Sequence, residues 1–224
     1  MSSDPFAFLS PAAAQDVALR TPMERAHRAA GAELEDRDGW RVAAYPSNGS
    51  ASAWLADLSH VGKIDVRGTG VQIDALTGGS ALGQASHVDG VWTLRLSPTH
   101  AVVICPFPRV AELRERIRSG EPALTVVDMT CGWAAMMIGG EHVREVFMRS
   151  SSLDVRPHRF PPGACMAGSV MRCASILLND DGRFWVLCGW EFGEYMWESL
   201  LDAGVTLGIA PVSSAVALGT EVAA

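Results

Sequence analysis

The sequence predicts an α+β fold of two intertwined halves, each with a split βαβ-like order and with helices packed on one face of antiparallel sheets. The segment Asp57–Gly68 returns in weaker form at Asp128–Gly139: in both, a hydroxyl residue lies two positions after the Asp, and a strand ends at a Gly eleven positions after it. Two apolar strands, ending at Cys105 and Cys188, lie 83 residues apart, and each precedes a helix. These two pseudo-repeats favour a duplicated architecture.

The first half begins with a short helix over 22–32, for which Thr21 is the expected N-cap and Gly31 the stop. Ile64 and Val66 alternate with polar neighbours, which predicts a half-buried strand. The other expected elements are a strand over 39–45, a loop over 46–50, a helical turn over 51–55, a helix over 71–76, strands over 91–96 and 100–105, and a helix over 109–119.

The second half is expected to repeat this order. A Pro-rich irregular connection over 153–163 separates its first helix from its later strands, and Asn179 to Gly182 has the composition of a hairpin turn. The expected elements are a strand over 134–138, a helix over 141–148, two short strands or one bent strand over 165–178, a strand over 184–188, a helix over 193–203 with Tyr195, Met196, Leu200 and Leu201 toward the core, and a final strand over 205–209.

These elements define three segments of the chain. Residues 1–20 are predicted to be an N-terminal arm with a short helix around 12–19, and residues 21–212 the folded domain, with halves at about 39–120 and 125–210. The small-residue segment 213–224 is predicted to be a flexible tail.

Composition excludes several classes of function. The chain is 48% hydrophobic and 19% charged, with a net charge of −7 and a single lysine, Lys63, so a nucleic-acid-binding surface is not expected. No apolar run is long enough for a membrane span and no signal peptide is recognisable, which predicts a cytoplasmic protein without a membrane partner. The five scattered cysteines and the histidine spacing predict reduced thiols and no metal site.

Asp57, Ser59 and His60 gather polar groups that could suggest a nucleophilic site. A turn at the start of a strand is the favoured interpretation, because Asp side chains accept hydrogen bonds from backbone N–H groups two residues on, and because the Asp-x-hydroxyl pattern recurs at Asp128. No catalytic residue is therefore predicted. Lys63 is expected to be a solvated charge at a strand end.

Asp57-Leu-Ser-His60, together with the segment Gly62–Gly68 and the upstream Gly39-Trp40 and Tyr45, resembles the folate-binding fold of the aminomethyltransferases, the glycine-cleavage T-proteins. The second half, with Gly139-Gly140, resembles more narrowly the gamma subunit of heterotetrameric sarcosine oxidase. The resemblance covers roughly residues 20–210.

The resemblance implies a non-catalytic gamma-type subunit of a flavin-dependent heteromeric amine oxidase or dehydrogenase. Its partners would be larger flavoprotein subunits, and the complex, rather than this chain, would carry FAD, FMN, NAD and tetrahydrofolate for oxidative demethylation of an N-methyl amine. The acidic residue that T-proteins carry after their first repeat helix has no clear equivalent, and the pterin-holding segment is represented only by the altered order of Gly189 to Tyr195.

Two alternatives stay open. One is an autonomous tetrahydrofolate-dependent aminomethyl or methyl transferase, and the other is a small-molecule binding module without catalysis. If a folate-like site persists, the resemblance and the residue types place it at Tyr45, Asp57, Glu191 and Tyr195, because carboxylates can pair with ring N–H donors. Glu194 is expected instead to stabilise the start of its helix.

Overall fold

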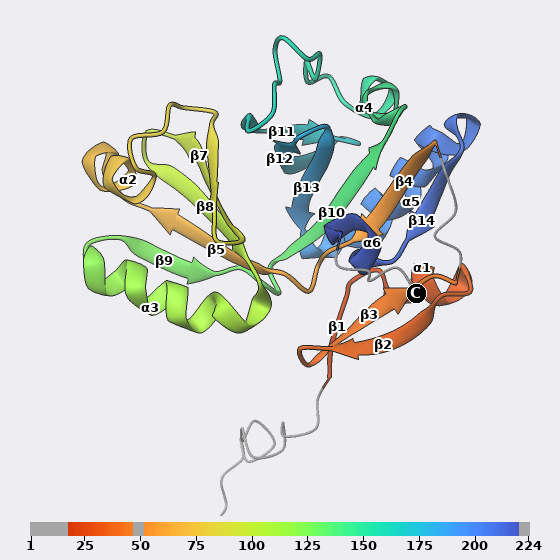
Figure 1. Cartoon of the computed structure of the whole chain (residues 1–224), viewed down its shortest axis with the longest axis horizontal. Helices are drawn as coiled ribbons and strands as arrows, with labels where there is room; N and C mark the ends of the chain where they lie inside the picture. Colours follow the sequence, from red (N-terminus) through yellow and green to blue (C-terminus); the bar gives the residue numbers. More distant parts are fainter. Residues whose placement is uncertain (1–17, 47–51, 220–224) are drawn as a thin grey trace, which may run out of the picture.

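The structure is a computed structural model that describes residues 18–46 and 52–219 (Figure 1). The strands, in chain order, are β1 (Leu19–Arg20), β2 (Glu33–Arg37), β3 (Trp40–Ala44), β4 (Ala53–Asp57), β5 (Gly62–Arg67), β6 (Ala85–Val88), β7 (Val91–Ser97), β8 (His100–Cys105), β9 (Thr125–Asp128), β10 (Trp133–Gly140), β11 (Cys165–Val170), β12 (Cys173–Asp180), β13 (Arg183–Gly189) and β14 (Ile209–Val212). The helices are α1 (Glu24–Ala29), α2 (Gly70–Leu76), α3 (Val110–Gly120), α4 (Val143–Ser150), α5 (Gly193–Gly204) and α6 (Ser214–Leu218), with 3-10 turns η3 (Phe107–Arg109), η4 (Trp190–Phe192) and η5 (Val205–Leu207).

The two halves contain the same elements in the same order. The series β5, α2, β6, β7, β8, α3 of the first half corresponds to β10, α4, β11, β12, β13, α5 of the second. The five-stranded sheet has the order β6-β7-β8-β5-β9, and the six-stranded sheet has the order β11-β12-β13-β10-β4-β14. Because β4 leads into β5 and β9 leads into β10, each half contributes one strand to the sheet of the other. This exchange confirms the predicted intertwined halves.

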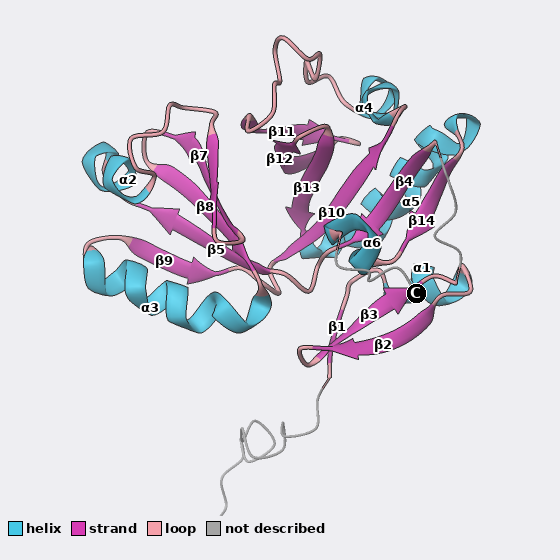
Figure 2. Cartoon of the chain, viewed as in Figure 1, coloured by secondary structure: helices cyan, strands magenta, loops and turns pink. Residues whose placement is uncertain are grey.

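The two larger sheets face each other, with α2 and α3 on the outer side of the five-stranded sheet and α4 and α5 on the outer side of the six-stranded sheet (Figures 1 and 2). Leu94 and Ile104 of one sheet and Met137 and Leu187 of the other belong to one buried cluster between the sheets. A second cluster joins the five-stranded sheet to α3, and a third joins the six-stranded sheet to α4 and α5. Each large apolar side chain that is fully buried in these clusters stabilises the fold by about 1.5–3 kcal/mol.

Several local predictions are confirmed. Ile64 and Val66 on β5 are fully buried, as the alternating pattern predicts. The hairpin between β12 and β13 turns through Asp181 and Gly182 with φ angles of 48° and 87°, as a two-residue turn of this composition requires. The predicted segment over 165–178 forms two strands, β11 and β12.

A three-stranded sheet of order β1-β3-β2 lies at the base of the six-stranded sheet, near α1 (Figure 1). Trp40 of β3 is fully buried and lies edge-on to Phe107, at a ring distance of 5.7 Å. An ion pair of 2.8 Å between Arg25 and Glu194 ties α1 to the first turn of α5. These contacts fix the N-terminal elements against both halves.

Four predictions of local structure or burial are wrong. The expected helical turn over 51–55 is strand β4, because Ala53–Asp57 pairs with β10 and β14, which lie far away in sequence. The expected strand over 205–209 is mostly η5, and the strand begins only at Ile209. Residues 214–218 of the predicted flexible tail form α6, with Ser214 and Ala217 buried. Tyr195 is 50% exposed rather than in the core.

Strands β1, β2, β6 and β9 are absent from the sequence prediction. Much of the predicted arm over 1–20, most of the helix around 12–19 and most of the loop over 46–50 lie outside the described residues.

Candidate functional site

Asp57 lies at the end of β4, where the chain crosses from the six-stranded sheet to the five-stranded sheet. Its Oδ1 accepts a hydrogen bond of 2.8 Å from the backbone N–H of Ser59. Asp128, at the end of β9, accepts a bond of 2.9 Å from the N–H of Thr130 in the same way. The predicted turn therefore occurs once in each half, at the two points where the chain passes between the sheets.

The two crossings also bind each other. The Ser59 hydroxyl accepts a hydrogen bond from the N–H of Ala135, and the Thr130 hydroxyl accepts one from the N–H of Lys63. These reciprocal bonds give the backbone N–H groups of Ala135 and Lys63 a side-chain acceptor at the crossover, in place of a strand partner. The polar head of the Asp57–Gly68 segment is thus a joint between the halves.

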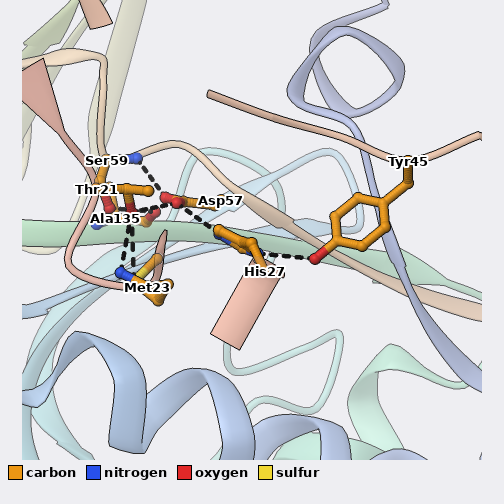
Figure 3. Close-up of polar contacts among 7 residues, drawn as sticks. All are labelled: Thr21, Met23, His27, Tyr45, Asp57, Ser59 and Ala135. Carbon is orange, nitrogen blue, oxygen red and sulfur yellow. Dashed lines mark hydrogen bonds and ion pairs between the residues drawn. The ribbon is translucent and has the colours of Figure 1, made fainter. Parts of the chain in front are cut away.

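Asp57 also belongs to a buried chain of hydrogen bonds (Figure 3). Its Oδ2 accepts bonds from the Thr21 hydroxyl and from Nε2 of His27, the latter at 2.9 Å. Nδ1 of His27 lies 2.7 Å from the Tyr45 hydroxyl. One imidazole tautomer satisfies all these groups: Nε2–H donates to Asp57, and Nδ1 accepts from the hydroxyl of Tyr45.

Burial and charge decide what this chain of hydrogen bonds can do chemically. His27 is fully buried, and its ring lies edge-on to Trp197 at 4.6 Å. Burial would raise the pKa of Asp57, but the hydrogen bonds from His27, Thr21 and Ser59 outweigh it, so the pKa is lowered and the carboxylate stays ionised. Burial, together with the nearby negative charge of Asp57, raises the pKa of Tyr45 well above its usual value.

The Tyr45–His27–Asp57 hydrogen-bond chain therefore joins the residue after β3 to α1 and β4 rather than presenting a reactive group to substrate. Tyr45 and Asp57 were predicted as ligand-binding residues. In the structure both lie within hydrogen-bond distance of His27, a residue that the sequence prediction did not include. Met23 and His27 lie four residues apart in the expected helix over 22–32, so they share one face. That spacing was the available signal that His27 is buried.

Glu191 and Tyr195 lie on the surface, at η4 and the first turn of α5. Glu191 is exposed, and its carboxylate folds back over Gly189. The Tyr195 hydroxyl donates a hydrogen bond of 3.2 Å to the carbonyl of Met171. Within residues 18–46 and 52–219, none of the assigned hydrogen bonds connects these two side chains to Tyr45 or Asp57.

Lys63 is not the solvated charge that was expected. Its side chain is fully buried, and Nζ donates a hydrogen bond of 2.8 Å to the carbonyl of Ser59. Burial lowers the pKa of this amine to about 7, although the carboxylates of Asp57 and Asp128 partly oppose the change. The alternating pattern missed this because it places Lys63 on the polar face of β5, whereas the crossing segment that contains Ser59 covers this end of the strand.

A cavity of about 640 Å³ lies between the two larger sheets. Its lining includes Arg37, His60, Trp92, Met137 and Trp185. Burial lowers the pKa of His60 to about 4, so its imidazole is neutral at physiological pH. Cavities of this size accommodate small organic molecules.

No group of three or more potential metal ligands occurs in the part of the chain that the structure describes. Among these residues there is also no helix of the length and apolarity needed to cross a bilayer.

Comparison of folds supports the architecture described above. A chain of heterotetrameric sarcosine oxidase from Corynebacterium sp. U-96 superposes with a TM-score of 0.66 at 18% identity, covering 86% of this chain and 98% of that chain. The glycine cleavage system aminomethyltransferase T from Bartonella henselae gives a TM-score of 0.71 at 16% identity, covering 88% of this chain and 60% of that chain. At these identities the likeness shows the fold alone.

No protein with a curated description matches the sequence. The family described as "Sarcosine oxidase, gamma subunit family" matches residues 83–206, which are more than half of the chain. The elements from β6 to α5 lie within this match, including both strands of the Cys105–Cys188 repeat. On this evidence, the chain belongs to the sarcosine oxidase gamma subunit family.

Proposed function

We propose that this chain is a non-catalytic subunit of a flavin-dependent, sarcosine-oxidase-like amine oxidase or dehydrogenase. Family membership supports a place in a heteromeric complex. The observation that carries the non-catalytic part is the saturation of Asp57: both carboxylate oxygens accept internal hydrogen bonds, and the side chain is buried with His27. A general base must instead reach a proton of the substrate.

In this proposal the larger subunits carry FAD, FMN and NAD, and the complex passes the methyl group of an N-methyl amine to tetrahydrofolate. The residues of this chain contribute the joint between two sheets, which gives the partners a rigid surface. Glu191 and Tyr195 lie on an open surface rather than in an enclosed pocket, and the Tyr195 hydroxyl is already occupied by Met171. Their arrangement does not favour a pterin site there.

The test compares the purified complex from the native host with the purified chain alone. The complex should show flavin absorbance and oxidise an N-methyl amine such as sarcosine, whereas the chain alone should do neither. Amine oxidation by the chain alone would overturn the proposal, and so would isolation of the wild-type chain without larger subunits under gentle conditions.

The cavity between the sheets favours a second candidate, in which the chain binds a small molecule such as tetrahydrofolate. Titration of the purified chain distinguishes the possibilities. Saturable binding that is lost in Trp92→Ala but kept in Glu191→Gln would locate the ligand in the cavity. Loss in Glu191→Gln or Tyr195→Phe would locate it at the surface site, and the absence of saturable binding would exclude this candidate.

A further inference from the structure

A second cavity, of about 410 Å³, lies on the outer side of the five-stranded sheet, between α2 and α3. Its walls combine polar residues with an apolar part that includes Leu76 of α2 and Leu113 and Ile117 of α3. Gly120 and Glu121, where α3 ends, also line it. A hydrogen bond of 3.2 Å from the Gln72 amide to Glu121 bridges the two helices at this end. The cavity therefore combines an apolar wall with a carboxylate and a helix C-terminus.

The internal repeat shows what occupies the same place in the second half. The strands ending at Cys105 and Cys188 align, and so do η3 and η4, which places Gly120 of α3 at the position of Ala203 in α5. In the preceding helices, the buried pair Ile73 and Thr77 of the first half corresponds to the buried pair Val146 and Ser150 of the second. Leu76 therefore corresponds to Arg149.

Arg149 is the group that fills this place in the second half. Its guanidinium donates hydrogen bonds of 3.1 Å to the carbonyl of Ala203 and of 2.7 Å to the hydroxyl of Thr206. A cation at a helix C-terminus is stabilised by the free carbonyls and by the helix dipole. In the first half, Leu76 provides no cation at the corresponding end of α3.

We propose that a basic side chain of a partner subunit, arginine or lysine, enters the α2–α3 cavity and takes the place that Arg149 has in the second half. Its aliphatic stem would pack on Leu76 and Ile117, and its charged head would lie at Glu121 and the last carbonyls of α3. Arg116 also lines the cavity; its side chain is largely exposed and lies 3.7 Å from the Glu112 carboxylate, so it points toward solvent along α3 and leaves the last carbonyls of the helix open. The chain's net charge of −7 favours a basic partner surface.

This inference rests on the proposed function, because it requires a heteromeric complex. The deciding variant is Leu76→Arg, which supplies within the chain the cation that the cavity would otherwise receive from the partner. The matched control is Ala111→Arg, which adds the same charge at an exposed position of α3 outside the cavity. Each tagged variant is produced in the native host, and the amount of larger flavin-containing subunits recovered per tagged chain is measured.

Recovery with Leu76→Arg should fall by about tenfold or more, while Ala111→Arg should leave it unchanged. Glu121→Gln, which removes the carboxylate and leaves the apolar wall intact, should also reduce recovery; it serves as the second variant if Leu76→Arg lowers the melting temperature. A photo-crosslinking residue at Ala75, which also lines the cavity, should recover a partner peptide containing arginine or lysine.

The outcomes separate this inference from the proposed function. If the wild-type chain has larger subunits but neither variant changes their recovery, the inference is wrong and the proposed function stands. If the wild-type chain has none, the proposed function fails. A crosslink to a second copy of this chain would show that the cavity holds another occupant, and so would an additional small-molecule mass on the intact chain. Either result would overturn the inference.

Discussion

Replacing Lys63 by methionine should stabilise the protein at neutral pH. The fully buried amine has a pKa of about 7 instead of 10.5. At about 1.4 kcal/mol per pH unit, this difference corresponds to a burial penalty of about 5 kcal/mol at most. The substitution also removes the hydrogen bond to the Ser59 carbonyl, which costs about 1–3 kcal/mol. A net stabilisation of about 2–4 kcal/mol is expected from these two effects.

The pH dependence has a definite sign. Because the pKa of Lys63 is lower in the folded state, the unfolded chain binds more protons between pH 7 and 10.5, and the wild type becomes more stable as the pH rises through that range. The advantage of Lys63→Met should therefore be constant below pH 7 and decrease above it. Denaturant unfolding at several pH values between 6 and 10.5 measures this difference.

The control is Lys63→Arg, which keeps a permanent charge and should destabilise the protein throughout this range. A Lys63→Met variant that is less stable than the wild type at pH 7 would refute the reasoning. So would a stability difference that does not change between pH 7 and 10.

Four further measurements test the joint between the halves. Asp57→Asn should cost about 3–5 kcal/mol of unfolding free energy at pH 7. Because the pKa of Asp57 is lower in the folded protein than in the unfolded chain, its stabilisation is complete above the unfolded pKa and is lost as the pH falls through the folded pKa. In unfolding titrations the cost of the substitution should therefore shrink below about pH 4. Tyr45→Phe should cost about 1–3 kcal/mol in denaturant unfolding by leaving Nδ1 of His27 unpaired, and an unchanged midpoint would contradict the hydrogen-bond chain. Gly139→Ala should lower the melting temperature, because its Cβ would lie 2.3 Å from the ring of Trp54; equal melting temperatures would exclude this close approach. In the native state one thiol should react with a disulfide reagent before the others, and Cys131→Ser should abolish this phase, because the other four cysteines are buried.

The intertwined fold could be predicted from the sequence because its signals are local and occur twice. Asp57 and Asp128 each fix a turn through the N–H two residues on, and the apolar strands ending at Cys105 and Cys188 precede equivalent helices. Period-2 and helical patterns are enough to find such elements.

The exchanged strand β4 could not be predicted in this way. Its five residues have no clear alternation, and Ala53 to Asp57 become a strand only because β10 and β14 pair with them. The hydrogen-bond chain has the same limit. Tyr45 and Asp57 could be named from the resemblance, but His27 reaches them only through the packing of α1, and Lys63 is buried only because the two crossings close over it.

The exchange of β4 and β9 has a consequence for how the chain is made. When β4 leaves the ribosome, its antiparallel neighbour β10 is still about 80 residues away in the chain, and its other neighbour β14 follows only near the C-terminus. Neither half can complete its sheet before the other has been synthesised, so no N-terminal fragment is an independent folding unit. Folding must then wait for nearly the whole chain, and C-terminal truncation before Ile209 removes β14 from the six-stranded sheet.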